Sequence, residues 1–150
     1  MIEETKKKME YYCSYQERCH QEVENKLAKM HLIGEVKRQV LLHLLENDFL
    51  NEERFSKAFA RGKFRIKKWG KQRIIRELRC RDISEYNIAS ALREISESDY
   101  KATFDELAQQ RLLKIKETNS YKRRKKLADY LVYRGWEATM VYEKVLELIP

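Results

Sequence analysis

The sequence predicts an all-α protein, and three observations lead to that prediction. The chain has only four glycines in 150 residues, and its one proline is the last residue, Pro150, whereas a β-protein of this size needs many turn residues. Aromatic residues make up 11% of the chain, which is too many for a disordered protein. Apolar residues recur with the period of an α-helix along nearly the whole chain.

The predicted helices begin and end where capping residues stand. Asn51, Ser84 and Ser98 each precede acidic residues, and a short polar side chain followed by acids is typical of a helix N-terminus. Three glycines lie in the breaks between apolar stripes: Gly34, Gly70 and Gly135. Residues expected to share one buried stripe on the helix after Asn51 are Phe55, Phe59 and Ile66.

An internal repeat organises the chain. Apolar residues stand at the same spacing in three places, with a turn expected at the third position of each set and a longer helix before each pair. The three sets are Val23, Leu27, Leu32, Leu41 and Leu44; Ile74, Leu78, Ile83, Leu92 and Ile95; and Leu127, Leu131, Trp136, Val145 and Leu148.

The repeat predicts three tandem three-helix units that form an elongated, curved array. We expect the units to occupy residues 1–48, 49–97 and 98–150. A unit of about 50 residues has a small core, so neighbouring units are expected to bury each other's remaining apolar surface. Such an array offers a long surface to a large partner and no deep pocket for a small-molecule substrate.

Positive charge is concentrated in two short segments. Residues 61–81 contain ten lysines and arginines against one acid, a net charge of +9. Residues 114–126 contain seven against one, a net charge of +6, in a chain whose total is +8. A solvated helix face accounts for many single basic runs, but two blocks this one-sided favour a polyanion or an acidic protein surface as partner.

The sequence contains no pattern typical of an enzyme or of a metal or cofactor site. No glycine-rich phosphate loop, HExxH or G-x-S-x-G motif is present, so no catalytic residue is expected. Cys13 and Cys19 stand six apart, which places them on different helix faces and argues against shared metal binding. The odd number of cysteines, three, fits reduced thiols in the cytoplasm. No secretory signal or membrane span is expected, since the longest apolar run is only residues 40–45.

Three motifs in order resemble those of the RecX family. Residues 49–59, FLNEERFSKAF, resemble its GYLDDxRFAxxF segment. Gly70, followed by the RI of residues 73–74 and the EL of 77–78, matches the G…RI…EL that comes next, and residues 126–136, KLADYLVYRGW, are similar to its YLxRRGF ending. One departure is Asp82, which stands where the family usually has a glycine after the EL helix; Asp can adopt the left-handed conformation at modest cost.

The resemblance implies a non-enzymatic regulator that lies along the groove of the RecA–DNA filament and restrains RecA activity, DNA repair and the SOS response. Its partner would be the RecA nucleoprotein filament, with single-stranded or duplex DNA as a further candidate, and no membrane or cofactor. Candidate binding residues are Arg61, Lys63, Arg65, Lys67, Lys68, Lys71, Arg73, Lys122, Arg123, Arg124, Lys125 and Arg134. For Arg54, Arg73 and Arg134, capping or pairing within the fold is an equal alternative to partner contact.

Two alternatives to the filament regulator stay open. A basic architectural protein would dock a helix-turn-helix-like segment, residues 71–95, on duplex DNA. Its recognition helix, residues 84–96, would offer mainly Asn87 and Arg93 among acids, which argues against sequence-specific reading of DNA. A helical scaffold for some other protein is the second alternative.

Overall fold

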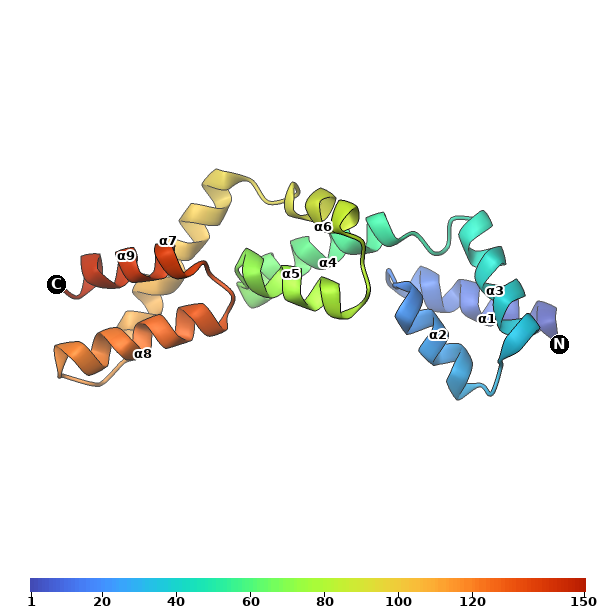
Figure 1. The fold of residues 1–150 in the computed structure, drawn as a ribbon, viewed down its shortest axis with the longest axis horizontal. Coiled ribbons are helices and arrows are strands. Elements are labelled where there is room, and N and C mark those ends of the chain that lie inside the picture. Colours follow the sequence, from blue (N-terminus) through green and yellow to red (C-terminus); the bar gives the residue numbers. More distant parts are fainter.

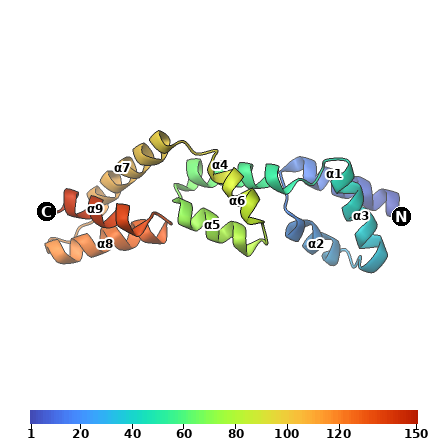
Figure 2. The same ribbon diagram turned by 45° about the horizontal axis from the view of Figure 1, so that its top comes forward.

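The protein is a row of nine α-helices without a strand, which confirms the predicted all-α class. The structure, a computed structural model, describes residues 1–150. The row is long and arched, with the two termini at opposite ends (Figures 1 and 2). The helices are α1 (Ile2–Tyr15), α2 (His20–Lys29), α3 (Gly34–Glu46), α4 (Glu52–Lys67), α5 (Lys71–Cys80), α6 (Glu85–Leu92), α7 (Glu97–Lys114), α8 (Ser120–Tyr133) and α9 (Ala138–Leu148).

Successive triplets of helices form three units, here called unit 1 (α1–α3), unit 2 (α4–α6) and unit 3 (α7–α9). In each unit the third helix packs on the first two: α3 on α1 and α2, α6 on α4 and α5, and α9 on α7 and α8. The division of the chain at 48/49 and 97/98 stays a prediction, and its second boundary falls one residue inside α7, which begins at Glu97.

Most helix ends follow from capping chemistry, with one correction. The side chains of Asn51 and Ser84 accept hydrogen bonds from backbone N–H groups three residues later, as predicted. The cap of α7 is Ser96 rather than Ser98, because its Oγ accepts from the backbone N–H of Asp99 at 3.1 Å. Asp82 has φ +57°, so it adopts the left-handed conformation expected where the family has glycine.

The repeated apolar positions form the core. All fifteen are either buried or packed against buried residues, which confirms the predicted spacing. The stripe predicted for α4 was partly wrong, since Ile66 is 78% exposed and Phe64 is buried in its place. The buried face of α4 follows Ser56, Ala60 and Phe64, which stand four residues apart, and Ile66 lies two residues past Phe64 on the opposite, exposed side of the helix.

The core is divided unequally between the units. Seven buried residues form a separate cluster in unit 1. Twenty buried residues form one cluster that extends through units 2 and 3, and Cys19, at the start of α2, is the one member from unit 1. None of the helices is long and apolar enough to cross a membrane.

Candidate nucleic-acid and partner interface

The first basic block lies on the last turns of α4 and along α5. Four of its cations are exposed and take part in none of the ion pairs of the structure: Arg65, Lys67 and Lys68 at the end of α4, and Arg76 on α5, which was absent from the residue-level prediction. Lys68 ends α4 in the left-handed conformation, with φ +57° and ψ +38°. This turn carries three positive charges into solvent between the two helices.

Other cations of the same block are held by neighbouring residues. Arg61 pairs with Glu94 at 2.6 Å, and Lys71 pairs with Glu97 at 3.1 Å. The Lys71 side chain is only 19% exposed, so this candidate binding residue is held against the fold. The Nζ of Lys63 lies 5.1 Å from the ring centroid of Trp69, a cation–π distance.

The second basic block lies on the loop before α8 and on its first turns. Lys122 is exposed, whereas Arg123 and Arg124 are half-buried. Arg124 donates a hydrogen bond to the carbonyl oxygen of Ile149 at 3.3 Å, so it ties α8 to the end of α9. Lys125 pairs with Asp129 at 2.9 Å, and that hydrogen bond raises the pKa of the lysine.

Two exposed lysines of the second block, Lys114 and Lys116, were absent from the residue-level prediction. They take part in no ion pair and stand at the end of α7 and in the loop that follows. The charge count of residues 114–126 already included them, and that count was the signal that pointed to them.

Arg73 and Arg134 belong to the junction between units 2 and 3. The guanidinium of Arg134 donates to the carbonyl oxygen of Lys67, and its carbon lies 5.2 Å from the Tyr130 ring centroid. The Arg73 guanidinium lies between two aromatic rings, 4.3 Å from Trp69 and 4.8 Å from Tyr133. Both arginines therefore contact their own chain, which is the alternative that the sequence left open for them.

Backbone contacts hold this junction together. Gly70 donates its N–H to the carbonyl oxygen of Arg134, and Gln72 donates to that of Gly135, both at 2.9 Å. A Cβ at Gly70 would lie 2.4 Å from the Gly135 oxygen, and one at Gly135 would lie 2.3 Å from the Cβ of Arg73. Only residues without a side chain permit this approach, so the two glycines fix how units 2 and 3 meet.

A buried tyrosine completes the junction. The Tyr100 hydroxyl accepts the backbone N–H of Lys71 at 2.8 Å and donates to the carboxylate of Glu137. Burial, followed by the hydrogen bond to Glu137, raises the pKa of Tyr100, so its phenol stays protonated. The neutral hydroxyl thus acts as donor and acceptor between the two units.

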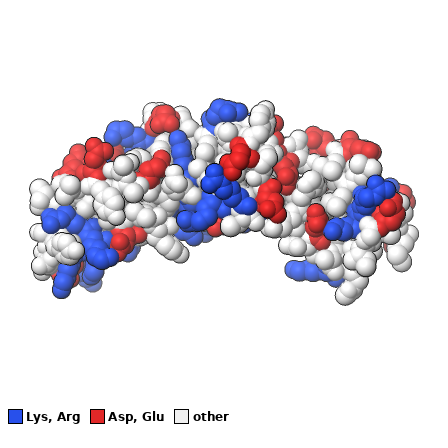
Figure 3. All heavy atoms as spheres, in the orientation of Figure 1, with Lys and Arg blue, Asp and Glu red and all other residues white.

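The basic blocks occupy corresponding helices of successive units. On the face shown in Figure 3, lysines and arginines gather near α5 in the middle of the arch and near α8 at one end. Because α5 and α8 are the second helices of their units, the two blocks recur one unit apart along the row. Such an arrangement presents two separated positive patches to one extended partner.

Neither the cysteines nor the predicted recognition helix forms a functional site. Burial raises the pKa of Cys13 and of Cys19 to about 11, so both thiols are protonated near neutral pH. No group of three or more His, Cys, Asp or Glu side chains is arranged to hold a metal ion. In α6, Asn87 is half-buried, and Arg93, just after it, donates to Ser90 at 3.0 Å.

Tandem three-helix units with basic patches on their surface define a helical-repeat protein that presents an extended surface. Two family models match the chain: the second three-helix domain of RecX at residues 51–92, and the third at residues 97–145. The chain therefore belongs to the RecX family, whose members are regulatory proteins. A comparison with curated protein sequences finds no significant match.

Solved structures share the fold of all three units. A crystal structure of regulatory protein RecX is 20% identical and superposes with a TM-score of 0.85, covering 97% of this chain and 73% of its own. A crystal structure of RecX from Lactobacillus salivarius is 19% identical with a TM-score of 0.81, covering 98% of this chain and 96% of its own. At these identities the likeness concerns the fold, and it extends to unit 1, which neither family model covers.

Proposed function

We propose that the chain binds the RecA–DNA filament and inhibits the recombinase and coprotease activities of RecA, and so modulates DNA repair and the SOS response. The observation that carries this proposal is the recurrence of a basic patch in two successive units of an arched row, extending in each from the end of the first helix into the second helix. A filament presents protein and phosphate surfaces at regular intervals, and a row of similar units can follow them over several protomers.

The exposed, unpaired cations are the side chains best placed to bind the filament. Arg65, Lys67, Lys68 and Arg76 in the first block, with Lys114, Lys116 and Lys122 in the second, project into solvent. Neutralising a phosphate releases condensed counterions, so binding weakens with salt, by roughly 0.7 in the log–log slope per phosphate on a single strand. Cations that already pair with acids of the same chain, such as Arg61 and Lys125, are expected to contribute less to filament binding.

Inhibition of RecA-catalysed strand exchange tests the proposal. Reversing Arg65, Lys67 and Lys68 to Glu is expected to weaken inhibition strongly, because six units of charge change on one patch. A control with the same change in charge reverses three exposed cations outside both blocks, Lys29, Arg38 and Lys101, and is expected to retain inhibition. Inhibition by the first variant equal to that of the natural chain, with helix content unchanged by circular dichroism, would show that the charge is only a solvated face.

A second variant asks whether both blocks act. Reversing Lys114, Lys116 and Lys122 to Glu is expected to weaken inhibition in the same way, with a shallower salt dependence. This set avoids Arg124, whose hydrogen bond to Ile149 makes its loss a change in stability as well as in charge. If only one of the two triple variants lost inhibition, a single patch would bind and the row would not act as a unit.

A further inference from the structure

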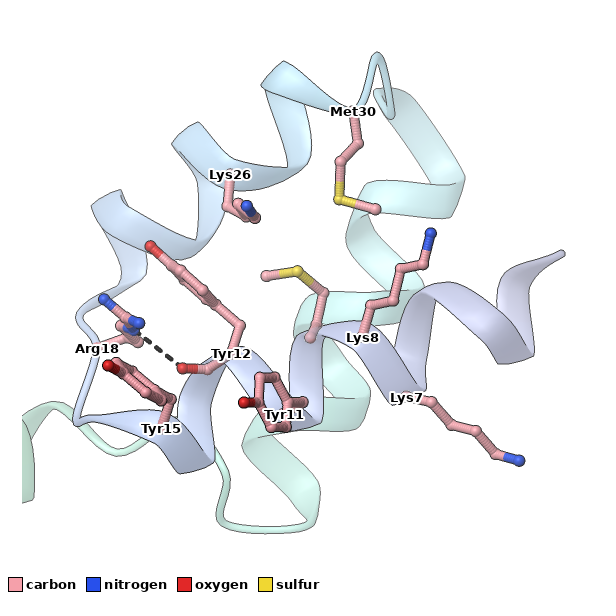
Figure 4. Close-up of a pocket in the computed structure, with 9 residues that line it drawn as sticks. Lys7, Lys8, Tyr11, Tyr12, Tyr15, Arg18, Lys26 and Met30 are labelled. Atoms are coloured by element: carbon pink, nitrogen blue, oxygen red, sulfur yellow. Dashed lines mark hydrogen bonds between the residues drawn. The ribbon is translucent and has the colours of Figure 1, made fainter.

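A cavity between α1 and α2 of unit 1 combines aromatic and cationic side chains without an acid. Its volume is about 740 Å³, and its lining consists of three tyrosines, two methionines, three lysines and one arginine. Figure 4 shows the tyrosines on α1 and Lys26 and Met30 on α2, with the space between them open to solvent. The charge of the sequence gives no sign of this cavity, because residues 1–60 have a net charge of −1.

The tyrosine rings offer free faces. Tyr11 and Tyr15 stand one helical turn apart on α1, each 72% exposed, with their ring centroids 6.4 Å apart. Tyr12 is half-buried and leans across the cavity toward α2 (Figure 4). Large aromatic faces left in water next to one another are typical of a surface on which a planar group stacks.

The cations at the cavity are unpaired. Arg18 is fixed in place, since its Nε donates to the Tyr12 carbonyl oxygen at 3.0 Å and its guanidinium lies 3.8 Å from the Tyr12 ring centroid. Lys8 and Lys26 extend toward the cavity, whereas Lys7 points away from it (Figure 4). Lys6, on the same helix, pairs with Glu3, but none of the four lining cations forms an ion pair.

We propose that this cavity binds unpaired bases of a single-stranded nucleic acid. Every base has a π-face that stacks on an exposed aromatic ring, and the phosphate beside it needs a cation within reach. Tyr11 and Tyr15 supply the rings, and Lys8 and Lys26 supply the charge. Duplex DNA does not present its base faces, and an acidic peptide uses the cations but leaves the rings unmatched, so a single strand is the partner that both chemistries fit.

A similar combination of tyrosines and cations lies between the first and second helices of unit 3, where the tyrosines belong to the second helix, α8. A cavity of about 540 Å³ between α7 and α8 is lined by Tyr130 and Tyr133 together with four cations and one acid. The guanidinium of Arg111 lies 4.2 Å from the Tyr130 ring centroid, and the guanidinium of Arg18 has a similar place over Tyr12 in unit 1. Its cations are Arg111, Lys114, Lys116 and Lys126. Cavities lined by tyrosines and cations thus occur between the first and second helices of two units, so the proposal does not depend on the position of one side chain.

Unit 2 has the aromatic residues at this place without a comparable opening. Phe59 of α4 and Trp69 before α5 pack edge to face with centroids 6.3 Å apart, and Lys63 lies over both rings. The rings there serve the fold. In unit 3 the acid Asp129 lines the cavity, and Arg111 and Arg134 already lie over the Tyr130 ring. We therefore assign single-strand binding to unit 1, and the cavity in unit 3 is its internal comparison.

This inference goes beyond the proposed function, because it concerns a contact with nucleic acid that requires no RecA. It also involves a different part of the molecule, since the two basic blocks belong to units 2 and 3. Binding to a naked single strand can therefore fail while filament inhibition persists, and the reverse outcome is equally distinguishable.

Fluorescence anisotropy with a short labelled oligothymidylate tests the assignment. We expect the strand to bind more tightly than a duplex of the same length. The double variant Tyr11→Leu, Tyr15→Leu should weaken binding by about tenfold or more, while binding of an abasic oligonucleotide of equal length stays the same. The double variant Lys8→Gln, Lys26→Gln should weaken binding of both oligonucleotides. Tyr86→Leu, at a tyrosine of α6 that is also 72% exposed, is the control and should change neither.

The natural chain allows a check that needs no variant. Ultraviolet crosslinking of an iodouracil-containing strand, followed by peptide mapping, should place crosslinks at Tyr11 or Tyr15. Unchanged oligothymidylate affinity in the tyrosine variant, or crosslinks confined to units 2 and 3, would overturn the assignment. So would equal loss of thymidylate and abasic binding in the tyrosine variant. Polyglutamate bound through the same residues, with no binding of oligothymidylate, would instead identify an acidic protein segment as the partner.

Discussion

The two junctions of this molecule are built differently. Units 2 and 3 share one core and exchange backbone hydrogen bonds around Gly70 and Gly135. Units 1 and 2 meet through one buried side chain, Cys19, and through polar contacts: Arg54 bonds to Glu17 at 2.7 Å and to Asp48 at 3.0 Å, and Glu52 accepts the backbone N–H of His20 at 2.9 Å. A shared core and bonded backbones make units 2 and 3 one cooperative body, whereas ion pairs over a small contact let unit 1 open on its own.

The difference has a functional consequence. A partner that bends or twists the row meets least resistance between units 1 and 2, so the α1–α2 cavity can change its place relative to the two basic blocks. The blocks themselves stay at a fixed separation because the junction between them is rigid. The array therefore combines a fixed pair of basic patches with a more mobile end unit.

Truncating core leucines should produce the largest difference in stability between unit 1 and the body formed by units 2 and 3. Leu78, Leu131 and Leu27 are all fully buried, and Leu→Ala at each is expected to lower the free energy of unfolding by about 2–5 kcal/mol. The Leu78 and Leu131 variants should lower hydrogen-exchange protection throughout units 2 and 3, whereas the Leu27 variant should lower it only in α1–α3. Leu113→Ala, at a site 85% exposed, is the control and should change little. Equal loss of protection in all nine helices from the Leu27 variant would make the chain a single cooperative body.

Adding a side chain at the close contact of Gly135 should have the next largest effect on stability. Gly135 has φ +97° and no room for a Cβ, so Gly135→Ala is expected to lower the free energy of unfolding by about 1–3 kcal/mol. Gly62→Ala is the matched control, since a Cβ there meets no atom within 4 Å and the residue is inside α4. That change should stabilise by about 0.5–1 kcal/mol. Denaturant unfolding followed by circular dichroism measures both, and equal effects would contradict the tight junction.

Removing the ion pairs between units 1 and 2 should have the smallest effect. The Arg54 side chain is 38% exposed, so Arg54→Met is expected to lower the free energy of unfolding by no more than about 1 kcal/mol. Hydrogen exchange should rise in α1–α3 and stay constant in α7–α9. Arg38→Met, which breaks an exposed pair with Glu35 inside unit 1, is the control. A loss of several kcal/mol from the Arg54 variant would show that this junction is as strong as the other.

The fold could be predicted from the sequence because the buried residues of a helical repeat recur at a regular spacing along the chain. Leu27, Leu78 and Leu131 stand at the same register position in their units and are all fully buried. Ile66 was misplaced because two apolar stripes fit the spacing in α4, and the buried one follows the small residues Ser56 and Ala60 to Phe64. Serines two residues apart, Ser96 and Ser98, compete for one cap, and only the backbone geometry decides between them.

The candidate site could be predicted only at the level of charge. The sequence located two basic blocks, but which cations are free depends on acids that are distant in the chain: Glu94 pairs with Arg61, and Glu97 pairs with Lys71. The α1–α2 cavity was missed for the opposite reason, since local acids such as Glu10 cancel the count there while their side chains lie outside the cavity. Net charge summed over a segment does not distinguish these arrangements.

Co-sedimentation with RecA filaments assembled on single-stranded DNA tests the central proposal most directly. Naked single-stranded and duplex DNA of the same length, in parallel tubes, provide the comparison at several salt concentrations. We expect the chain to sediment with the filament at concentrations where neither naked DNA retains it, because RecA surfaces and phosphates contribute together. Tighter retention by naked duplex than by the filament would contradict the proposal and would favour an architectural DNA-binding protein.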